Sequence, residues 1–378
     1  MKTRLLLPLL LLPIIAAAQT YTYSTLVSFP AQQGPLNPTT QLIIDGAGNL
    51  YGTSQAGGIY APPFGDGTVF KVSPTGVLTV LHSFNGTDGL SPESILTRDK
   101  AGNLYGTTLD GGAYNKGTVY KVAPDGTETV LYNFPGNGPN GNYPTTGLIL
   151  DSVGDLLGYT SYTDNNFVTN GGSIFKITPQ GIFSRLHDFC NLGSVCTNGG
   201  GPIDHLIRDN AGNYYGVNCC GGGGTVFKLS PKNKLTVLVA FSPTGGGPYD
   251  PISALVQDAA GNLFGLAVGG GNGVYKITPS GAASMLYSFP AGTGLNSLLA
   301  IDASGNLYGT TSFGGTNGFG SVYQVSSAGV ETDLVSASST TPLGNSVAVD
   351  SAGNLYGTTF SGGENGTGSI FKLTKIAD

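Results

Sequence analysis

The chain has 378 residues and a formal net charge of −6, and only 10% of its residues are charged, against roughly 25% in ordinary globular domains. It contains no basic patch, which argues against nucleic acid as a partner. Its 62 glycines hold fixed positions in a sequence that is 39% hydrophobic, and this combination indicates ordered turns rather than disorder.

The first 18 residues differ from the rest of the chain. Lys2 and Arg4 give a positive start, residues 5–15 form an apolar run, and alanines at 16–18 fit a cleavage site. The run is shorter than the ~20 residues of a membrane-spanning helix, which favours a signal peptide over a membrane anchor. We predict a signal peptide at 1–18 and a single secreted domain at 19–378, extracellular or periplasmic, with no membrane span.

A nine-residue stretch, Asp-Lys-Ala-Gly-Asn-Leu-Tyr-Gly-Thr at residues 99–107, recurs seven times with small changes. Self-similarity at a fixed period predicts a repeat architecture. The intervals between successive copies are 54, 52, 58, 49, 44 and 48 residues. The first residues of the copies are Asp45, Asp99, Asp151, Asp209, Asp258, Asp302 and Asp350.

The second repeat shows the expected elements in chain order. Short extended segments are predicted at 95–98, 103–108, 117–122 and 127–134, separated by an Asp-Gly turn, a Gly-Gly loop and a Pro-Asp-Gly turn. Four short strands in about fifty residues are typical of a propeller blade. We therefore predict an all-β, seven-bladed β-propeller of four-stranded antiparallel blades, whose recurrent aromatic residues pack between blades.

The two ends of the repeat region complement each other. Residues 24–29 match a fourth strand such as residues 79–84, whereas the last repeat stops after its third strand, at 369–373. We predict that the N-terminal strand completes the last blade and closes the ring, which removes the exposed sheet edges.

These motifs resemble the GloVer (Gly/Val-type) tandem-repeat family of exported bacterial proteins. The resemblance rests on Gly-Thr-Val-Phe-Lys at 67–71, on the Asp-x-x-Gly-Asn-Leu-Tyr-Gly-Thr stretch and on Gly111-Gly112, and it covers nearly all of the chain after residue 18. The Asp-x-x-Gly-Asn-Leu-Tyr piece is also similar to NHL-like β-propellers. The resemblance implies secretion and a propeller, and it supplies neither a defined activity nor catalytic residues.

The strand order places the tight turns on one face of the propeller, here called the turn face. The loops between second and third strands and the connections between blades lie on the other, the loop face. The turns are nearly identical between repeats, whereas the loops vary, as binding surfaces tend to. We therefore predict a glycan or protein partner on the loop face, contacted by the long loops at 55–66 and 161–170 through Tyr60, Phe64, Tyr162 and Phe167.

Two groups of residues raise the question of a metal ion. Each repeated turn offers one Asp and one Asn, too few oxygens for calcium, so we assign these residues to turn capping. Repeat alignment also gathers a set of polar residues at the mouth of the central channel, where propeller lactonases hold calcium: Glu93, Asp204, His205, Ser253, Asn296 and Asn345. The sequence contains no catalytic motif, so we predict no catalytic residue, metal or other cofactor, with calcium at this mouth as the alternative.

The four cysteines are Cys190, Cys196, Cys219 and Cys220. Export favours disulfides over zinc, because the spacing lacks paired Cys-x-x-Cys elements. Disulfides between the 190–196 loop and residues 219–220 are preferred over local bonds, because a bond between adjacent cysteines is strained. Taken together, the sequence predicts a monomeric exported binding or scaffold module, with a calcium-dependent lactonase- or lyase-like enzyme as the alternative.

Overall fold

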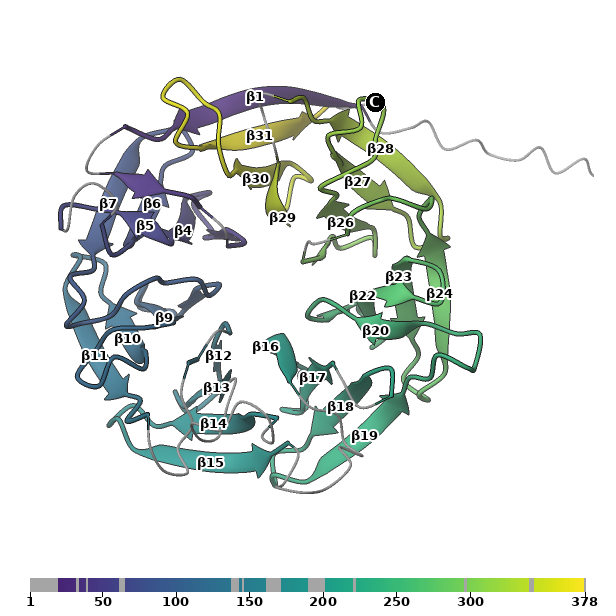
Figure 1. The fold of residues 1–378 in the computed structure, drawn as a ribbon, viewed down its shortest axis with the longest axis horizontal. Coiled ribbons are helices and arrows are strands. Elements are labelled where there is room, and N and C mark those ends of the chain that lie inside the picture. The colour runs from purple at the N-terminus through teal and green to yellow at the C-terminus, as the bar shows by residue number, and fades with distance from the viewer. Residues whose placement is uncertain are drawn as a thin grey trace, which may run out of the picture.

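The computed structural model describes the chain over residues 20–31, 34–38, 40–60, 65–136, 143–144, 146–160, 171–189, 201–219, 222–295, 298–339 and 343–376. Seven blades of antiparallel strands surround a central axis, as predicted (Figure 1). In these ranges the secondary structure is strands, turns and bends. Within them, no helix is long and apolar enough to cross a membrane.

Each blade runs from an inner strand beside the axis to an outer strand. From blade 1 to blade 7, the inner strands are β3 (Ile43–Ile44), β8 (Thr97–Arg98), β12 (Ile149–Leu150), β16 (Pro202–Arg208), the pair β20 (Tyr249–Pro251) and β21 (Val256–Gln257), β25 (Ala300–Ile301) and β29 (Leu343–Val349). The second strands are β4 (Leu50–Ser54), β9 (Leu104–Thr108), β13 (Leu156–Thr160), β17 (Tyr214–Asn218), β22 (Leu263–Gly269), β26 (Leu307–Thr310) and β30 (Leu355–Thr359).

The outer half of each blade has two longer strands. The third strands are β6 (Thr68–Val72), β10 (Thr118–Val122), β14 (Ser173–Ile177), β18 (Thr225–Leu229), β23 (Gly273–Ile277), β27 (Ser321–Val325) and β31 (Ser369–Lys375). The fourth strands are β7 (Leu78–Ser83), β11 (Glu128–Asn133), β15 (Phe183–Asp188), β19 (Leu235–Ala240), β24 (Ala283–Ser288), β28 (Glu331–Ser336) and β1 (Tyr21–Ser28). A separate pair, β2 (Pro35–Leu36) and β5 (Ala56–Gly57), lies on the loop face of blade 1.

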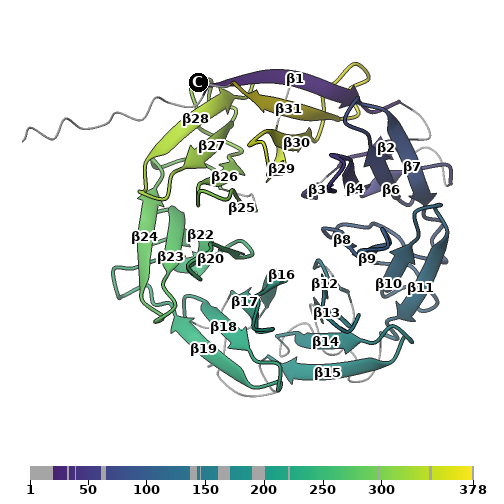
Figure 2. The same ribbon diagram turned by 180° about the vertical axis from the view of Figure 1, so that it is seen from behind.

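The ring closes as the sequence predicted. β1 pairs antiparallel with β31 in a register that runs from Tyr21 opposite Lys375 to Ser28 opposite Ser369. Figure 2 shows β1 as the outermost strand of the seventh blade, next to the C-terminal strand. The pairing gives the last blade four strands, as in every other blade except blade 5, whose inner strand is split into β20 and β21.

The core lies between blades. Seven hydrophobic clusters each combine buried residues of two neighbouring blades, including the junction between blades 7 and 1. At six junctions, the Phe after a fourth strand packs edge-on or tilted against the third-strand ring of the next blade, with ring centroids 4.7–5.4 Å apart. At the seventh junction Ala337 takes the place of that Phe, and Tyr23 of β1 stacks on Phe371 at 5.6 Å. The N-terminal strand therefore also supplies an aromatic contact in the blade that it closes.

One glycine of each repeat is required by this packing. A Cβ on Gly52 would lie 2.7 Å from the ring of Phe70, and one on Gly106 would clash with Oη of Tyr120. The third-strand ring thus crosses the second strand where that strand has no side chain, which explains the invariant Gly of Leu-Tyr-Gly-Thr.

The inner strand of blade 2 is shorter than predicted. Residues 95–98 were expected to be extended, and only Thr97–Arg98 pair with the second strand. Beyond this short pairing, a side chain takes the place of a backbone acceptor: the amide of Thr107 in the second strand donates to Oγ of Ser94 at 3.0 Å. A side-chain acceptor replaces a backbone one in the same way in blade 5, where the Leu266 amide donates to Oγ of Ser253 at 2.8 Å.

Candidate functional site

The repeated Asp on the turn face acts as a turn cap. Oδ1 of Asp45 accepts the backbone amides of Ala47 and Asn49 at 3.0 and 2.9 Å, and Oδ2 accepts Nδ2 of Asn49 and Oη of Tyr51, both at 3.0 Å. Burial on its own raises the pKa of Asp45, but the hydrogen bonds from Asn49, Tyr51 and Ala47 outweigh it and lower the pKa below its usual value. The carboxylate therefore has four donors and holds the turn together, as the sequence predicted.

The third repeat departs from this pattern. Asp155 stands where other repeats have Asn, and Nζ of Lys176 lies 2.7 Å from its Oδ2. The aromatic residue moves two positions along the strand, to Tyr159, which is fully buried. Its hydroxyl reaches the next blade, because a Cβ on Gly216 would overlap it. This hydroxyl is buried without a hydrogen-bond partner.

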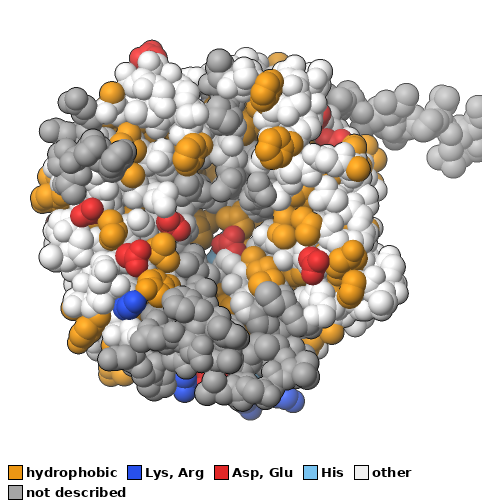
Figure 3. Space-filling model, viewed as in Figure 1, with side chains coloured by type: hydrophobic (Ala, Val, Ile, Leu, Met, Phe, Trp, Pro, Cys, Tyr) orange, Lys and Arg blue, Asp and Glu red, His pale blue; other side chains and the backbone are white. Residues whose placement is uncertain are grey.

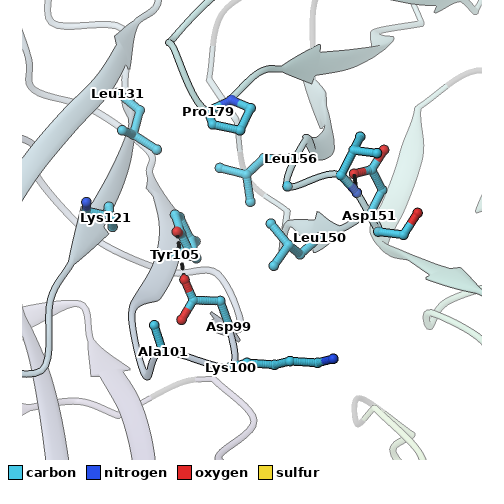
Figure 4. Close-up of a pocket in the computed structure, with 13 residues that line it drawn as sticks. Asp99, Lys100, Ala101, Tyr105, Lys121, Leu131, Leu150, Asp151, Leu156 and Pro179 are labelled. Atoms are coloured by element: carbon cyan, nitrogen blue, oxygen red, sulfur yellow. Dashed lines mark hydrogen bonds between the residues drawn. The ribbon is translucent and has the colours of Figure 1, made fainter.

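Shallow cavities lie between blades on the turn face. A cavity of about 640 Å³ separates blades 2 and 3, with the Asp99–Tyr105 hydrogen bond on one wall and Leu150 and Pro179 on the other (Figure 4). A cavity of about 480 Å³ has the equivalent lining between blades 4 and 5. On the wall of the first cavity, the Asp99 carboxylate already accepts from Asn103 and Tyr105, so it has little acceptor capacity left for a ligand.

Three charged or ionisable residues of the predicted channel mouth, Glu93, Asp204 and His205, lie in two separate hydrogen-bonded pairs. Nε2 of Gln55, in blade 1, donates to Oε1 of Glu93 at 2.5 Å. Burial raises the pKa of Glu93, and the Gln55 hydrogen bond offsets part of that rise. In blade 4, Nδ1 of His205 lies 2.9 Å from Oδ1 of Asp204.

The Asp204–His205 pair stands on an irregular inner strand. The register of β16 shifts between Ile203 and Ile207, and Asp204 has a φ of 57°, in the left-handed region. Such a bulge re-aims side chains. His205 lies beside Gly147 of the neighbouring blade. A Cβ on Gly147 would be 3.2 Å from the Cβ of His205. Ser253 instead takes a structural position through its bond to Leu266. Asn296 and the side chain of Asn345 lie outside the described part, so the shared calcium site stays an untested alternative.

Exposed aromatic side chains gather on the loop face. Tyr60 of the predicted set is 43% exposed, whereas Phe64, Tyr162 and Phe167 lie outside the described residues. Sequence reasoning missed four further rings on loops of the same kind, at 48–63% exposure: Tyr114, Phe313, Phe319 and Phe360. The five described rings belong to blades 6, 7, 1 and 2, which are consecutive around the ring. An aromatic residue in any second-to-third-strand loop, whatever its length, is the signal that would have found them.

The loop face carries more acidic than basic side chains among its described residues. Figure 3 shows the loop face with hydrophobic side chains standing singly around a central hollow, with more acidic than basic groups. Of the described lysines and arginines, Lys116 is the one in a second-to-third-strand loop, and it donates to Oη of Tyr143 at 2.6 Å. The described carboxylates on this side include those of Asp66, Asp88, Glu93, Asp110, Asp204, Asp250 and Glu364. A face of this kind repels polyanions and suits a neutral or cationic partner.

The cysteines remain a prediction. The sulfur of Cys219 lies 3.2 Å from the carbonyl oxygen of Gly201. Cys190, Cys196 and Cys220 lie outside the described residues, so no pairing is tested.

The blade order, the closed ring and the seven interblade cores define a seven-bladed β-propeller built from one tandem repeat. The Gloeobacter/Verrucomicrobia repeat matches residues 15–197 and 162–297. The chain belongs to this repeat family, which is the one that the Gly/Val-type motifs indicated. No curated protein matches the sequence.

Solved structures share the fold at low sequence identity. A puromycin hydrolase mutant is 12% identical with a TM-score of 0.57, over 87% of this chain and 50% of that one. The extracellular domain of a protein described as a hybrid two-component system from B. thetaiotaomicron is 14% identical with a TM-score of 0.56, over 93% and 41%. A gluconolactonase from Xanthomonas campestris is 16% identical with a TM-score of 0.43, over 73% and 83%. At these identities the likeness concerns the fold alone.

Proposed function

We propose that this chain is an exported, monomeric binding module that captures a neutral glycan on its loop face. The observation that carries the proposal is the arc of five exposed rings on blades 6, 7, 1 and 2. Large rings exposed at consecutive blades add nothing to the core, and they give a partner apolar surface at little cost in side-chain entropy. The predicted signal peptide at residues 1–18 supports export.

The surroundings of the rings favour a glycan over a protein. The rings stand singly among Gly, Asn, Thr and Ser residues, such as the Thr-Asn-Gly sequence at 316–318 next to Phe319. Flat apolar faces flanked by amides and hydroxyls match the alternation of C–H faces and hydroxyls on a sugar. A protein partner is better served by one contiguous apolar patch with a dry centre.

The lactonase-like alternative has less support on the described residues. Glu93 and Asp204 are each engaged with a neighbour, Gln55 and His205 respectively, and no described third carboxylate joins them. The gluconolactonase likeness has a TM-score below 0.5 and does not bear on activity.

The test is a pull-down on insoluble neutral polysaccharides, with cellulose, chitin and β-1,3-glucan as probes. The wild-type protein should be retained by at least one of them, and a variant with Ser at Tyr60, Tyr114, Phe313, Phe319 and Phe360 should be lost from it. The matched control replaces four exposed aliphatic residues of the turn face with Ser: Val77, Val153, Ile182 and Val330. Retention of the loop-face variant, or loss of the control variant, would contradict the proposal, and so would a wild-type protein that only a protein partner retains.

A further inference from the structure

Three side chains with metal-binding atoms meet at the junction between blades 1 and 2. His82 belongs to β7, Glu128 begins β11, and Asp88 lies in the connection between the two blades. One nitrogen of His82 and one carboxylate oxygen each of Asp88 and Glu128 all lie within 4.8 Å of one another. No other group of three His, Cys, Asp or Glu side chains in the described ranges meets this condition.

At two other junctions, the residues at the equivalent positions contact each other without a group of three ionisable side chains. Tyr132 occupies the position of His82 in blade 2, and it stacks on Phe183 of blade 3 with centroids 4.7 Å apart. Tyr287 of blade 5 donates its hydroxyl to Oε2 of Glu331 at 3.3 Å. The first junction instead brings together an imidazole and two carboxylates.

The loop that carries Asp88 is fixed by its own hydrogen bonds. Oδ1 of Asp88 accepts the amide of Asn85 at 3.0 Å, and its backbone carbonyl accepts Oγ1 of Thr118 at 3.1 Å. These bonds aim Oδ2 at Nε2 of His82, 3.1 Å away. The imidazole ring is held edge-on to Phe84, with centroids 4.9 Å apart and planes at 84°. Outer contacts of this sort orient the ligands of metal sites.

The third group has no partner of its own. Oε1 of Glu128 is buried and has no hydrogen-bond partner. Nε2 of His82 carries one proton at most, and Asp88 already lies within bonding distance of it. Two carboxylates held this close together and partly desolvated call for a proton or a cation between them.

We infer that His82, Asp88 and Glu128 form a zinc-type site for a divalent transition metal ion that links blade 1 to blade 2. One imidazole nitrogen and two carboxylate oxygens match the three protein ligands of a four-coordinate zinc site. Calcium fits less well, because it requires six to eight oxygen ligands. Tetrahedral bonds of about 2.0–2.2 Å separate neighbouring ligand atoms by about 3.3–3.6 Å. The His82–Asp88 distance of 3.1 Å is close to that separation.

Isothermal titration of the chelator-treated protein with Zn²⁺ tests the site. The wild-type protein should bind one ion at the cluster, and Glu128→Gln and His82→Gln should each weaken this binding by about tenfold or more. The matched control is His187→Gln. His187 occupies the same strand position in blade 3, where the residue equivalent to Glu128 in the next blade is Leu235, so this variant should bind zinc as the wild type does.

Thermal melting separates loss of the site from loss of the fold. Glu128→Gln keeps the shape of the side chain and removes a buried charge, so the metal-free variant should melt at or above the wild-type temperature. Zn²⁺ should raise the melting temperature of the wild type and of His187→Gln, but not that of Glu128→Gln. Absence of zinc binding, a preference for Ca²⁺, or unchanged zinc binding in both ligand variants, as cysteine-bound zinc would give, overturns the inference.

Discussion

The two faces of the propeller put their side chains to opposite uses. On the turn face, Asp45 and its equivalents use their acceptor capacity within the turn itself, as the four donors to Asp45 show. On the loop face, large rings stay in contact with solvent, and Phe313 and Tyr114 remain 63% and 59% exposed. Residues that recur in every repeat, such as Asp45, therefore serve the fold, whereas residues that differ between repeats, such as Phe313, remain exposed and available to the partner that we propose.

Among the surface residues of the two faces, the largest effect should come from removing a turn cap. Asp99→Ala deletes acceptors for the Asn103 amide, the Asn103 side chain and the Tyr105 hydroxyl, and should lower the free energy of unfolding by about 1–2 kcal/mol. The loop-face variant Asp110→Ala should stay within about 0.5 kcal/mol of the wild type. Denaturant unfolding of the two variants measures the contrast, and equal losses would show that the two faces do not differ in this respect.

Acid should weaken the turn face next. The lowered pKa of Asp99 results from its hydrogen bonds to Asn103 and Tyr105, which outweigh the opposing effect of burial. Its contribution to stability is therefore present above the unfolded-state pKa of about 3.9 and is lost as the pH falls through the lowered folded value. The stability gap between wild type and Asp99→Asn, followed by thermal melting from neutral pH downward, should narrow on acidification; a constant gap would disagree with the assigned cause.

The contribution of Glu93, on the loop face, to stability should depend on pH with the opposite sign. Burial raises its pKa, so the folded protein holds this proton more tightly than the unfolded chain does, and the energetic cost is present above the folded pKa. Glu93→Gln should raise stability at pH 7 by less than about 1 kcal/mol, because solvent at the channel mouth screens the charge. The gain should vanish near pH 4, and a variant that is less stable than the wild type at pH 7 would count against this account.

The smallest effect on stability should come from the exposed rings. Tyr114 is 59% exposed, and Tyr114→Ser should change the free energy of unfolding by no more than about 0.5 kcal/mol. The reference is Tyr120→Ser, which removes a fully buried ring and should cost about 3–5 kcal/mol. Denaturant titration of both variants compares the two losses in the free energy of unfolding. A large loss for Tyr114→Ser would assign that ring to the fold instead of to a partner.

The sequence predicted the fold well because repeated local signals specify it. The Asp-x-x-Gly-Asn turn, the third-strand ring and the Gly beneath it recur in register, so one repeat predicts the other six. The spare strand at residues 24–29 was enough to predict how the ring closes. The role of Tyr23 was not predictable, because the loss of a Phe at position 337 does not say which ring takes its place.

The candidate sites were harder to predict because they depend on how blades face each other. His82 and Glu128 lie 46 positions apart in the sequence, and only the packing of β7 against β11 brings their side chains together. The bulge that gives Asp204 a positive φ leaves no sequence signature of its own. Loop length does not predict rings such as Phe360, because the position of a residue within the blade decides its exposure.

Binding on the loop face is best tested by hydrogen–deuterium exchange of the protein with and without the oligosaccharide form of a retained polysaccharide. We predict that the sugar slows exchange in the second-to-third-strand loops of blades 6, 7, 1 and 2, at residues 311–320, 360–368, 55–60 and 109–117, and leaves the Asp-x-x-Gly-Asn turns unchanged. Protection confined to the turns around Asp99 and Asp209, with the loops unaffected, would contradict it and place the binding surface on the opposite face.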